Sequence, residues 1–120
     1  RKKIATEFLQ LSCSGQCDKA YEHVDMVSFK HHNIHFTGDA KSLKDAQQES
    51  ANKMPNKVID IKTVVQEGDL VTTWSLVTMS TEMKVQVCHM FRFDSRNRVV
   101  ELWDMGQIVP EKIPNENGPL

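Results

Sequence analysis

The stretch MKVQVCHMFRFDSRNRVVELWDMGQIV (Met83–Val109) decides the fold of this chain. Its apolar pattern predicts two long strands joined by a tight turn at Ser95–Arg98. Because successive side chains of a strand point to opposite faces, each face of this hairpin carries alternate residues of both strands. In the register that the turn sets, the facing pairs are Phe93 with Val100, Phe91 with Leu102, and His89 with Asp104.

One face of the hairpin is apolar except for two residues, His89 and Asp104. A carboxylate that an apolar environment desolvates can act as a general base near neutral pH. A neighbouring imidazole can orient that carboxylate or donate to a developing oxyanion. We therefore expect this face to line a pocket, although a paired histidine and aspartate that only brace the fold remain an alternative.

The opposite face of the hairpin has a different character. On this face Glu101 lies opposite Arg92, and this pairing predicts a cross-strand ion pair. Met90 and Trp103 share this outer face and make it partly apolar, as a dimer interface requires. We expect a homodimer that packs through the sheet.

The remaining pattern predicts helices first and strands afterwards. Apolar residues at helical spacing predict helices over Lys2–Cys13, Gln16–Val24 and Ala40–Met54, the last capped by Asp39 or Ser42. Branched, alternating segments predict strands over the ranges Asp25–Asn33, Lys57–Gln66 and Leu70–Met79. Helices segregated from a mainly antiparallel sheet of four to six strands indicate an α+β fold, in which a curved sheet wraps three helices into a cone.

Composition narrows the class of protein. A length of 120 residues favours one domain, over 1–110, followed by a polar tail over 111–120. The net charge of -1, from 15 basic and 16 acidic residues, argues against nucleic-acid binding, and no apolar run is long enough to cross a membrane. Three cysteines, an odd number, favour reduced thiols and a cytoplasmic protein. Because the chain opens at Arg1 rather than at a methionine, residues that precede it are expected.

Four segments together resemble the SnoaL-like polyketide cyclase family of the nuclear transport factor two-like superfamily. They are FKHHNIHF (Phe29–Phe36), VVQEGDLV (Val64–Val71), HMFRFD (His89–Asp94) and VVELWDMGQ (Val99–Gln107). The resemblance covers about Ile4 to Pro110. It implies a cone-shaped α+β barrel, also called a cystatin-like roll, with a deep apolar pocket and often a homodimer.

The resemblance also implies site residues. Asp104 matches the acid/base aspartate of the cyclases, and His89 and His32 match assisting histidines. Three features depart from the pattern: Ile34 stands where many relatives carry proline, Leu102 where they often carry histidine, and the turn Ser95–Arg98 lacks the glycine that they usually have. Such a cyclase performs an intramolecular aldol condensation, so the leading expectation is acid/base chemistry, aldol-type cyclisation or isomerisation, on a hydrophobic carbonyl compound. The alternative is a non-catalytic ligand-binding or dimerisation domain.

Other residues are expected around a small hydrophobic ligand: Phe29, Phe91, Leu102, Asn33 and Tyr21. Asn33 either binds the ligand or ends its strand, and Tyr21 either reaches into the cone from the second helix or belongs to the core. No cofactor and no metal are expected, because no cluster has the spacing of metal ligands. His31 and His32 are adjacent on a strand, so they point to opposite faces and only one can face the pocket.

Overall fold

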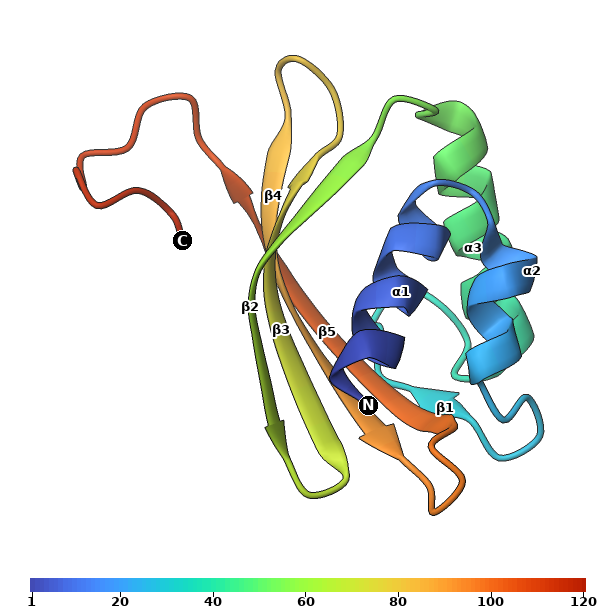
Figure 1. Cartoon of the computed structure of the whole chain (residues 1–120). Helices are drawn as coiled ribbons and strands as arrows, with labels where there is room; N and C mark the ends of the chain where they lie inside the picture. The colour runs from blue at the N-terminus through green and yellow to red at the C-terminus, as the bar shows by residue number, and fades with distance from the viewer.

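The computed structural model describes all residues, 1–120, and places every helix on one side of a single sheet (Figure 1). The helical elements are α1 (Lys2–Cys13), α2 (Cys17–Ala20), the 3-10 turn η1 (Tyr21–His23) and α3 (Ala40–Lys53). The strands are β1 (Lys30–His31), β2 (Val58–Glu67), β3 (Leu70–Thr78), β4 (Lys84–Phe93) and β5 (Val99–Val109). No helix is long and apolar enough to span a bilayer.

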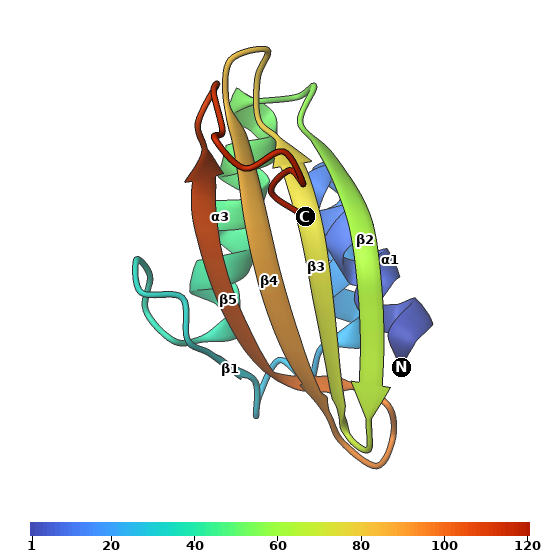
Figure 2. The same ribbon diagram turned by 90° about the vertical axis from the view of Figure 1, so that its left-hand side faces the viewer.

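The sheet has the order β1-β5-β4-β3-β2, antiparallel except where β1 runs parallel to β5. It curves around the helices, which cover its inner face, while its outer face stays open (Figure 2). The C-terminal tail beyond β5 projects away from the sheet on this outer side (Figure 1). This is the cone-shaped α+β fold that the pattern of helices and strands predicts.

The β4–β5 hairpin has the predicted register over most of its length. His89 faces Asp104 and Phe91 faces Leu102, as expected. The predicted pairing of Phe93 with Val100 is wrong, because a bulge after Arg92 pairs Phe93 with Val99 instead. The extra residue of a bulge shifts the alternation of its strand, so Val99 is the valine that is fully buried.

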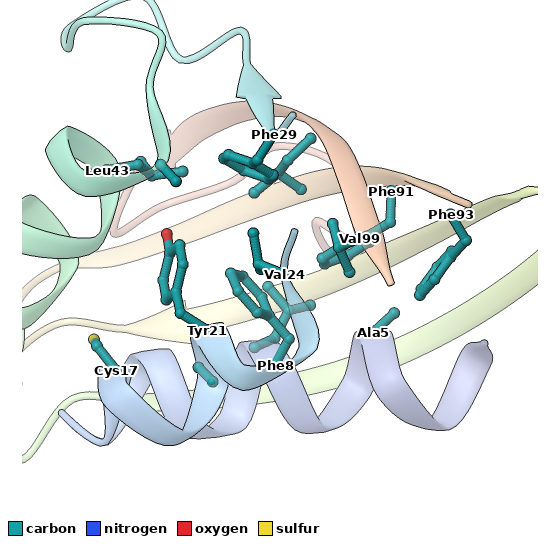
Figure 3. Close-up of a cluster of buried hydrophobic side chains, with 14 of the residues drawn as sticks. Ala5, Phe8, Cys17, Tyr21, Val24, Phe29, Leu43, Phe91, Phe93 and Val99 are labelled. Atoms are coloured by element: carbon teal, nitrogen blue, oxygen red, sulfur yellow. The ribbon is translucent and has the colours of Figure 1, made fainter. Parts of the chain in front are cut away.

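The core lies between α1, η1 and the inner face of the sheet (Figure 3). Phe8 of α1 is fully buried, and its ring packs edge-on against Phe91 with the centroids 5.7 Å apart. The ring of Tyr21 lies 5.1 Å from Phe8 and 6.3 Å from Phe29. Such tilted and edge-on contacts are the favourable geometries for aromatic pairs. The aromatic cluster therefore fastens the helices to the sheet.

The N-terminal half differs from the prediction in two elements. The second helix ends earlier than expected, because Cys17–Ala20 gives way to the 3-10 turn. The expected strand over Asp25–Asn33 shrinks to β1, because the Asp25 carboxylate accepts hydrogen bonds from the backbone amides of Val27 and Ser28 and forms a turn. The third helix is capped by Asp39, which accepts from the Ser42 amide at 3.1 Å.

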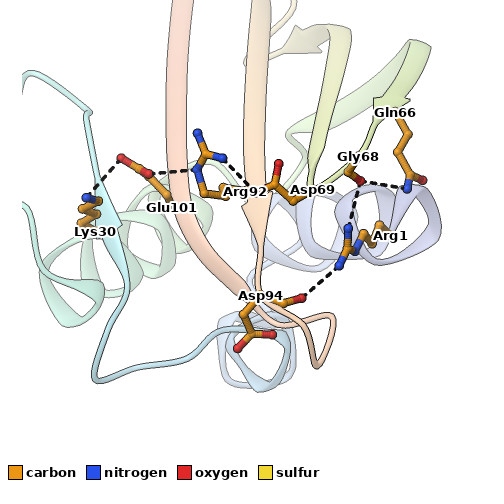
Figure 4. Close-up of polar contacts among 8 residues, drawn as sticks. All are labelled: Arg1, Lys30, Gln66, Gly68, Asp69, Arg92, Asp94 and Glu101. Carbon is orange, nitrogen blue, oxygen red and sulfur yellow. Dashed lines mark hydrogen bonds and ion pairs between the residues drawn. The ribbon is translucent and has the colours of Figure 1, made fainter.

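A chain of charged side chains ties the lower end of the sheet together (Figure 4). Glu101 lies 3.7 Å from Lys30 and 3.3 Å from Arg92, which confirms the predicted cross-strand pair. Arg92 also binds Asp69 at 2.9 Å. At the same end, the Arg1 guanidinium donates to the carbonyls of Gly68 and Asp94, so the N-terminus is bound to two hairpin turns.

Candidate functional site

A cavity of about 270 Å³ lies between the inner face of the sheet and helices α1 and α3. Its apolar wall includes Leu9, Phe36, Leu43, Ile59, Val77 and Met79. Its polar lining includes Ser12, Asn33, Gln47, Ser50, Lys57, His89 and Asp104. The molecule has a larger hollow of about 820 Å³, but that one lies beneath the C-terminal tail, away from the histidine–aspartate pair. We take the smaller cavity as the candidate site because only it contains both residues of the pair.

Asp104 is held in the cavity wall by one amide. The side-chain nitrogen of Asn33 donates to both of its carboxylate oxygens, at 3.2 Å and 2.9 Å. Asn33 itself is fixed, because its backbone amide donates to Nδ1 of His31 while the ring of His31 bonds the Thr37 carbonyl through Nε2. The segment that follows β1 therefore orients the Asp104 carboxylate from one side, and His89 lies on its other side.

His89 reaches the same wall from the neighbouring strand β4. Burial lowers the pKa of His89 to about 4, and the negative charge of Asp104 only partly opposes that shift. The ring is therefore neutral at pH 7. Its Nδ1 is enclosed and has no hydrogen-bond partner. An enclosed polar atom without a hydrogen-bond partner lowers the stability of the fold. A group that enters the site and bonds this nitrogen would remove that cost.

Lys57 lines the cavity beside the start of β2, across the sheet from Asp104. Its ammonium donates to the hydroxyl of Ser50 on α3 at 2.8 Å. The thiol of Cys13 lies nearby, 3.7 Å from the Lys57 carbonyl. Burial raises the pKa of the Cys13 thiol, and the charge of Lys57 offsets only part of that effect. The cavity thus has an acidic side and a basic side.

Tyr21 lies in the second layer behind the cavity. Its hydroxyl donates to the side-chain oxygen of Gln47 at 2.7 Å, and Gln47 lines the cavity. Burial is the main cause that raises the pKa of Tyr21 far above its usual range. The phenol therefore stays protonated and orients Gln47, whereas the ring itself belongs to the core.

The structure does not bring His32 to this group. Its ring stacks on Trp103 with the centroids 4.9 Å apart, and its Nε2 bonds the Glu101 carboxylate at 2.7 Å. Both contacts lie on the outer side of the sheet. Burial alone would raise the pKa of Glu101, but the hydrogen bonds from His32 and Arg92 and the charge of Lys30 outweigh it and hold that pKa below its ordinary value. The inner position belongs to His31, because β1 pairs His31 with the inward-facing Leu102.

Four residues expected around the ligand lie in the core instead of lining the cavity. Phe29, Phe91, Leu102 and Tyr21 each keep no more than about a twentieth of their surface exposed, and they pack on α1 and on one another. Leu102, where the resemblance leads one to expect histidine, is fully enclosed. Of the expected ligand-binding set only Asn33 lines the cavity, together with the two expected catalytic residues His89 and Asp104.

The sequence pattern did not single out the basic side of the cavity. Ser12 and Cys13 end α1, Ser50 lies in the last turn of α3, and Lys57 directly precedes β2. The one indication in the sequence is the helical spacing of Leu43, Gln47 and Ser50, which places these three residues on the same side of α3. No cluster of three or more histidine, cysteine, aspartate or glutamate side chains has the geometry to hold a metal ion.

The acidic side has the parts of a general base with an adjacent neutral donor. Asp104 presents a carboxylate that Asn33 orients, and His89 presents a neutral ring beside it. Such a pair can remove a proton from carbon and stabilise the oxyanion that results.

Comparisons with known proteins identify the fold. No protein-family model and no curated protein sequence matches the chain. Among solved structures, it resembles a SnoaL-like protein of unknown function from Burkholderia thailandensis, with a TM-score of 0.72 at 11% identity over 88% of this chain and 92% of that one. It also resembles a nuclear transport factor two-like protein of unknown function from Burkholderia xenovorans, with a TM-score of 0.72 at 14% identity over 93% and 85% of the two chains.

A third similar structure is described as a candidate polyketide cyclase from Acidithiobacillus ferrooxidans. Its TM-score is 0.70 at 17% identity, over 88% of this chain and 86% of that chain. The chain therefore has the fold that SnoaL-like and nuclear transport factor two-like proteins share, as the sequence segments predict.

Proposed function

We propose that this chain is a small-molecule enzyme that performs acid/base chemistry on a hydrophobic carbonyl compound, with Asp104 as the base. The observation that carries the proposal is the convergence of Asp104, Asn33 and His89 on one wall of the 270 Å³ cavity. The similarity to structures described as candidate polyketide cyclases supports the same class of chemistry. A fold alone does not define an activity, so the activity is proposed from the residues of the cavity.

The proposed step is the removal of a proton alpha to a carbonyl. The proton passes to a carboxylate oxygen of Asp104, and the electron pair of the C–H bond becomes the enolate. Neutral His89 donates a hydrogen bond to the oxygen on which negative charge develops, in a site that is partly shielded from water. The apolar wall from Leu9, Leu43 and Ile59 holds the carbon skeleton against the pair.

Two outcomes are open to the enolate. Attack on a second carbonyl of the same molecule gives an aldol-type cyclisation, and return of the proton to another carbon gives an isomerisation. Both begin with the same proton transfer, so a test of that transfer tests both.

Deuterium exchange into 2-tetralone tests the proposal. This hydrophobic ketone has acidic protons alpha to its carbonyl and fits a cavity of this size. We expect the wild-type chain to catalyse exchange in D2O, followed by proton NMR, and Asp104→Asn to slow it by about 100-fold or more, as loss of a general base does. Asp60→Asn, on the outer side of the sheet, is the matched control. Equal exchange by wild type and Asp104→Asn overturns the proposal.

We also propose that two copies pack through the outer face of the sheet. Met105 is 77% exposed there, and Trp74, Trp103 and Met90 lie half-buried on neighbouring strands. An apolar patch of this kind on a sheet face is typical of an interface. A second copy is the occupant that fits, because the lower end of the same face carries both signs of charge in Arg92 and Asp69, as a self-complementary surface needs.

The state of the cysteines supports a cytoplasmic location as part of the proposal. Cys13, Cys17 and Cys88 are all free thiols. Burial raises the pKa of each of the three, which keeps them protonated and slow to oxidise. Free thiols of this kind fit a reducing compartment.

A further inference from the structure

Lys57 occupies a fixed place at the basic side of the cavity. Its backbone amide donates to the Met54 carbonyl at 3.1 Å, so the turn between α3 and β2 holds the residue at the cavity wall. Its side chain is directed at α3, where the ammonium meets the Ser50 hydroxyl at 2.8 Å. The residue is half-buried and lines the cavity.

The charge of Lys57 has no acidic partner. Lys53, on the last turn of α3, pairs with Glu49 at 2.9 Å, and Lys62 on β2 pairs with Asp60. Lys57 bonds only a neutral hydroxyl. Because the ammonium of this half-buried residue faces no carboxylate, an anion that enters the cavity would supply a partner of opposite charge.

A second polar group at this side also lacks a partner. Ser12 is only 5% exposed and lines the same cavity, and its hydroxyl oxygen is enclosed without a hydrogen bond. Buried hydroxyls in proteins normally have partners. The hydroxyl of Ser12 is therefore available to donate to an acceptor that binds beside Lys57.

The two charges in the cavity set the orientation of such a ligand. Asp104 on β5 and Lys57 before β2 are separated by β4 and β3, and they also lie apart along the strands, because the residue of β2 level with Asp104 is Val64. The Asp104 carboxylate repels an anion, and Lys57 attracts it. An anionic group that enters the cavity would therefore bind at Lys57, with the opposite end of the molecule at Asp104 and His89.

We propose that the substrate is an acid as well as a carbonyl compound: a hydrophobic keto acid whose carboxylate binds Lys57 and whose carbonyl lies against Asp104 and His89. This inference rests on the proposed function for its carbonyl end. It adds a carboxylate subsite, formed by Lys57 with the hydroxyls of Ser50 and Ser12. Charge-assisted hydrogen bonds are the strong ones in proteins, so the subsite selects acids over neutral isosteres.

A pair of isosteric probes tests the subsite without any proton transfer. Naphthalene-2-carboxylate carries the anion, naphthalene-2-carboxamide is its neutral counterpart, and titration calorimetry at pH 7 measures both. We expect the wild-type chain to bind the carboxylate about tenfold more tightly, in keeping with one charge-assisted hydrogen bond. Lys57→Met should abolish this preference and leave carboxamide affinity within about twofold, while Lys57→Arg should retain it.

Lys53→Met is the matched control, because it removes an exposed lysine four residues away and should leave the preference intact. Circular dichroism verifies folding, and Ser50→Ala gives a second, milder reduction of the preference if Lys57→Met unfolds. Equal binding of the two probes to wild type, a preference that survives Lys57→Met, or binding of neither probe overturns the inference. These outcomes are independent of deuterium exchange, so the subsite can fail while Asp104 acts as base, and the reverse.

Discussion

At the scale of single residues, His89 makes stability depend on pH. Its pKa is lowered from 6.5 to about 4 in the folded chain, so between these values the unfolded chain binds more protons. Stability that is fully present above pH 6.5 is therefore lost as the pH falls toward 4, by up to about 3 kcal/mol. Urea unfolding at a series of pH values measures this slope.

His89→Gln should remove most of the slope between pH 6.5 and about 5, above the range in which carboxyls with lowered pKa values such as Asp94 and Glu101 add to it, whatever its effect on stability at pH 7. Val87→Ala, two residues away on the same face of β4, is the control, since it should destabilise the chain and keep the slope. A slope that His89→Gln leaves unchanged would show that this ring is not held neutral by burial.

The identity of the site residues could be predicted only in part. Strand alternation was enough to place His89 with Asp104, because a register set by one turn carries over a whole hairpin. Alternation also required His31 and His32 to face opposite ways, but only the pairing of β1 with β5 determines which one faces inward. The place of Lys57 in the cavity could not be predicted from the sequence. It depends on the packing of α3 over the start of β2, which no local sequence pattern indicates.

At the scale of elements, α1 depends on one aromatic anchor. Phe8 contacts both Phe91 of β4 and Tyr21 of η1. Phe8→Ala should lower the free energy of unfolding by about 3–5 kcal/mol, the cost of emptying a buried aromatic site. Gln10→Ala, on the exposed side of the same helix, should change it by no more than about 0.5 kcal/mol. Denaturant unfolding compares them, and a small loss for Phe8→Ala would contradict this arrangement of the core.

The elements themselves were largely predictable. The long helices and the four long strands follow from periodic apolar patterns, and their bounds agree within one residue. The exceptions are short. The strand expected over Asp25–Asn33 is mostly replaced by the turn at Asp25, and the bulge near Val100 arises where the strand bends, which no period-two pattern encodes.

At the scale of the whole molecule, the outer face of the sheet should hold two copies together. We expect a dimer in sedimentation velocity at tens of micromolar, and a monomer for Met105→Lys, which places a charge in the middle of the patch. Val27→Lys is the control, because Val27 is 97% exposed in a loop outside the sheet. A wild-type chain that sediments as a monomer would exclude this interface.

In the whole molecule, the two faces of the β4–β5 hairpin carry the residues of the two proposed roles. The inner face of β4 and β5 carries His89 and Asp104 to the cavity, and the outer face carries Met90 and Trp103. Lys57 then gives the cavity a polarity that the hairpin alone does not have.

The central claim is that Asp104 and His89 act together on one bound molecule. A double-mutant cycle tests it most directly, with the rate of deuterium exchange into 2-tetralone measured for wild type, Asp104→Asn, His89→Gln and the double variant. If the two residues form one unit, each single change slows exchange, and the double variant is no more than about twofold slower than Asp104→Asn alone. Effects that multiply independently, or exchange that neither change slows, would contradict the claim.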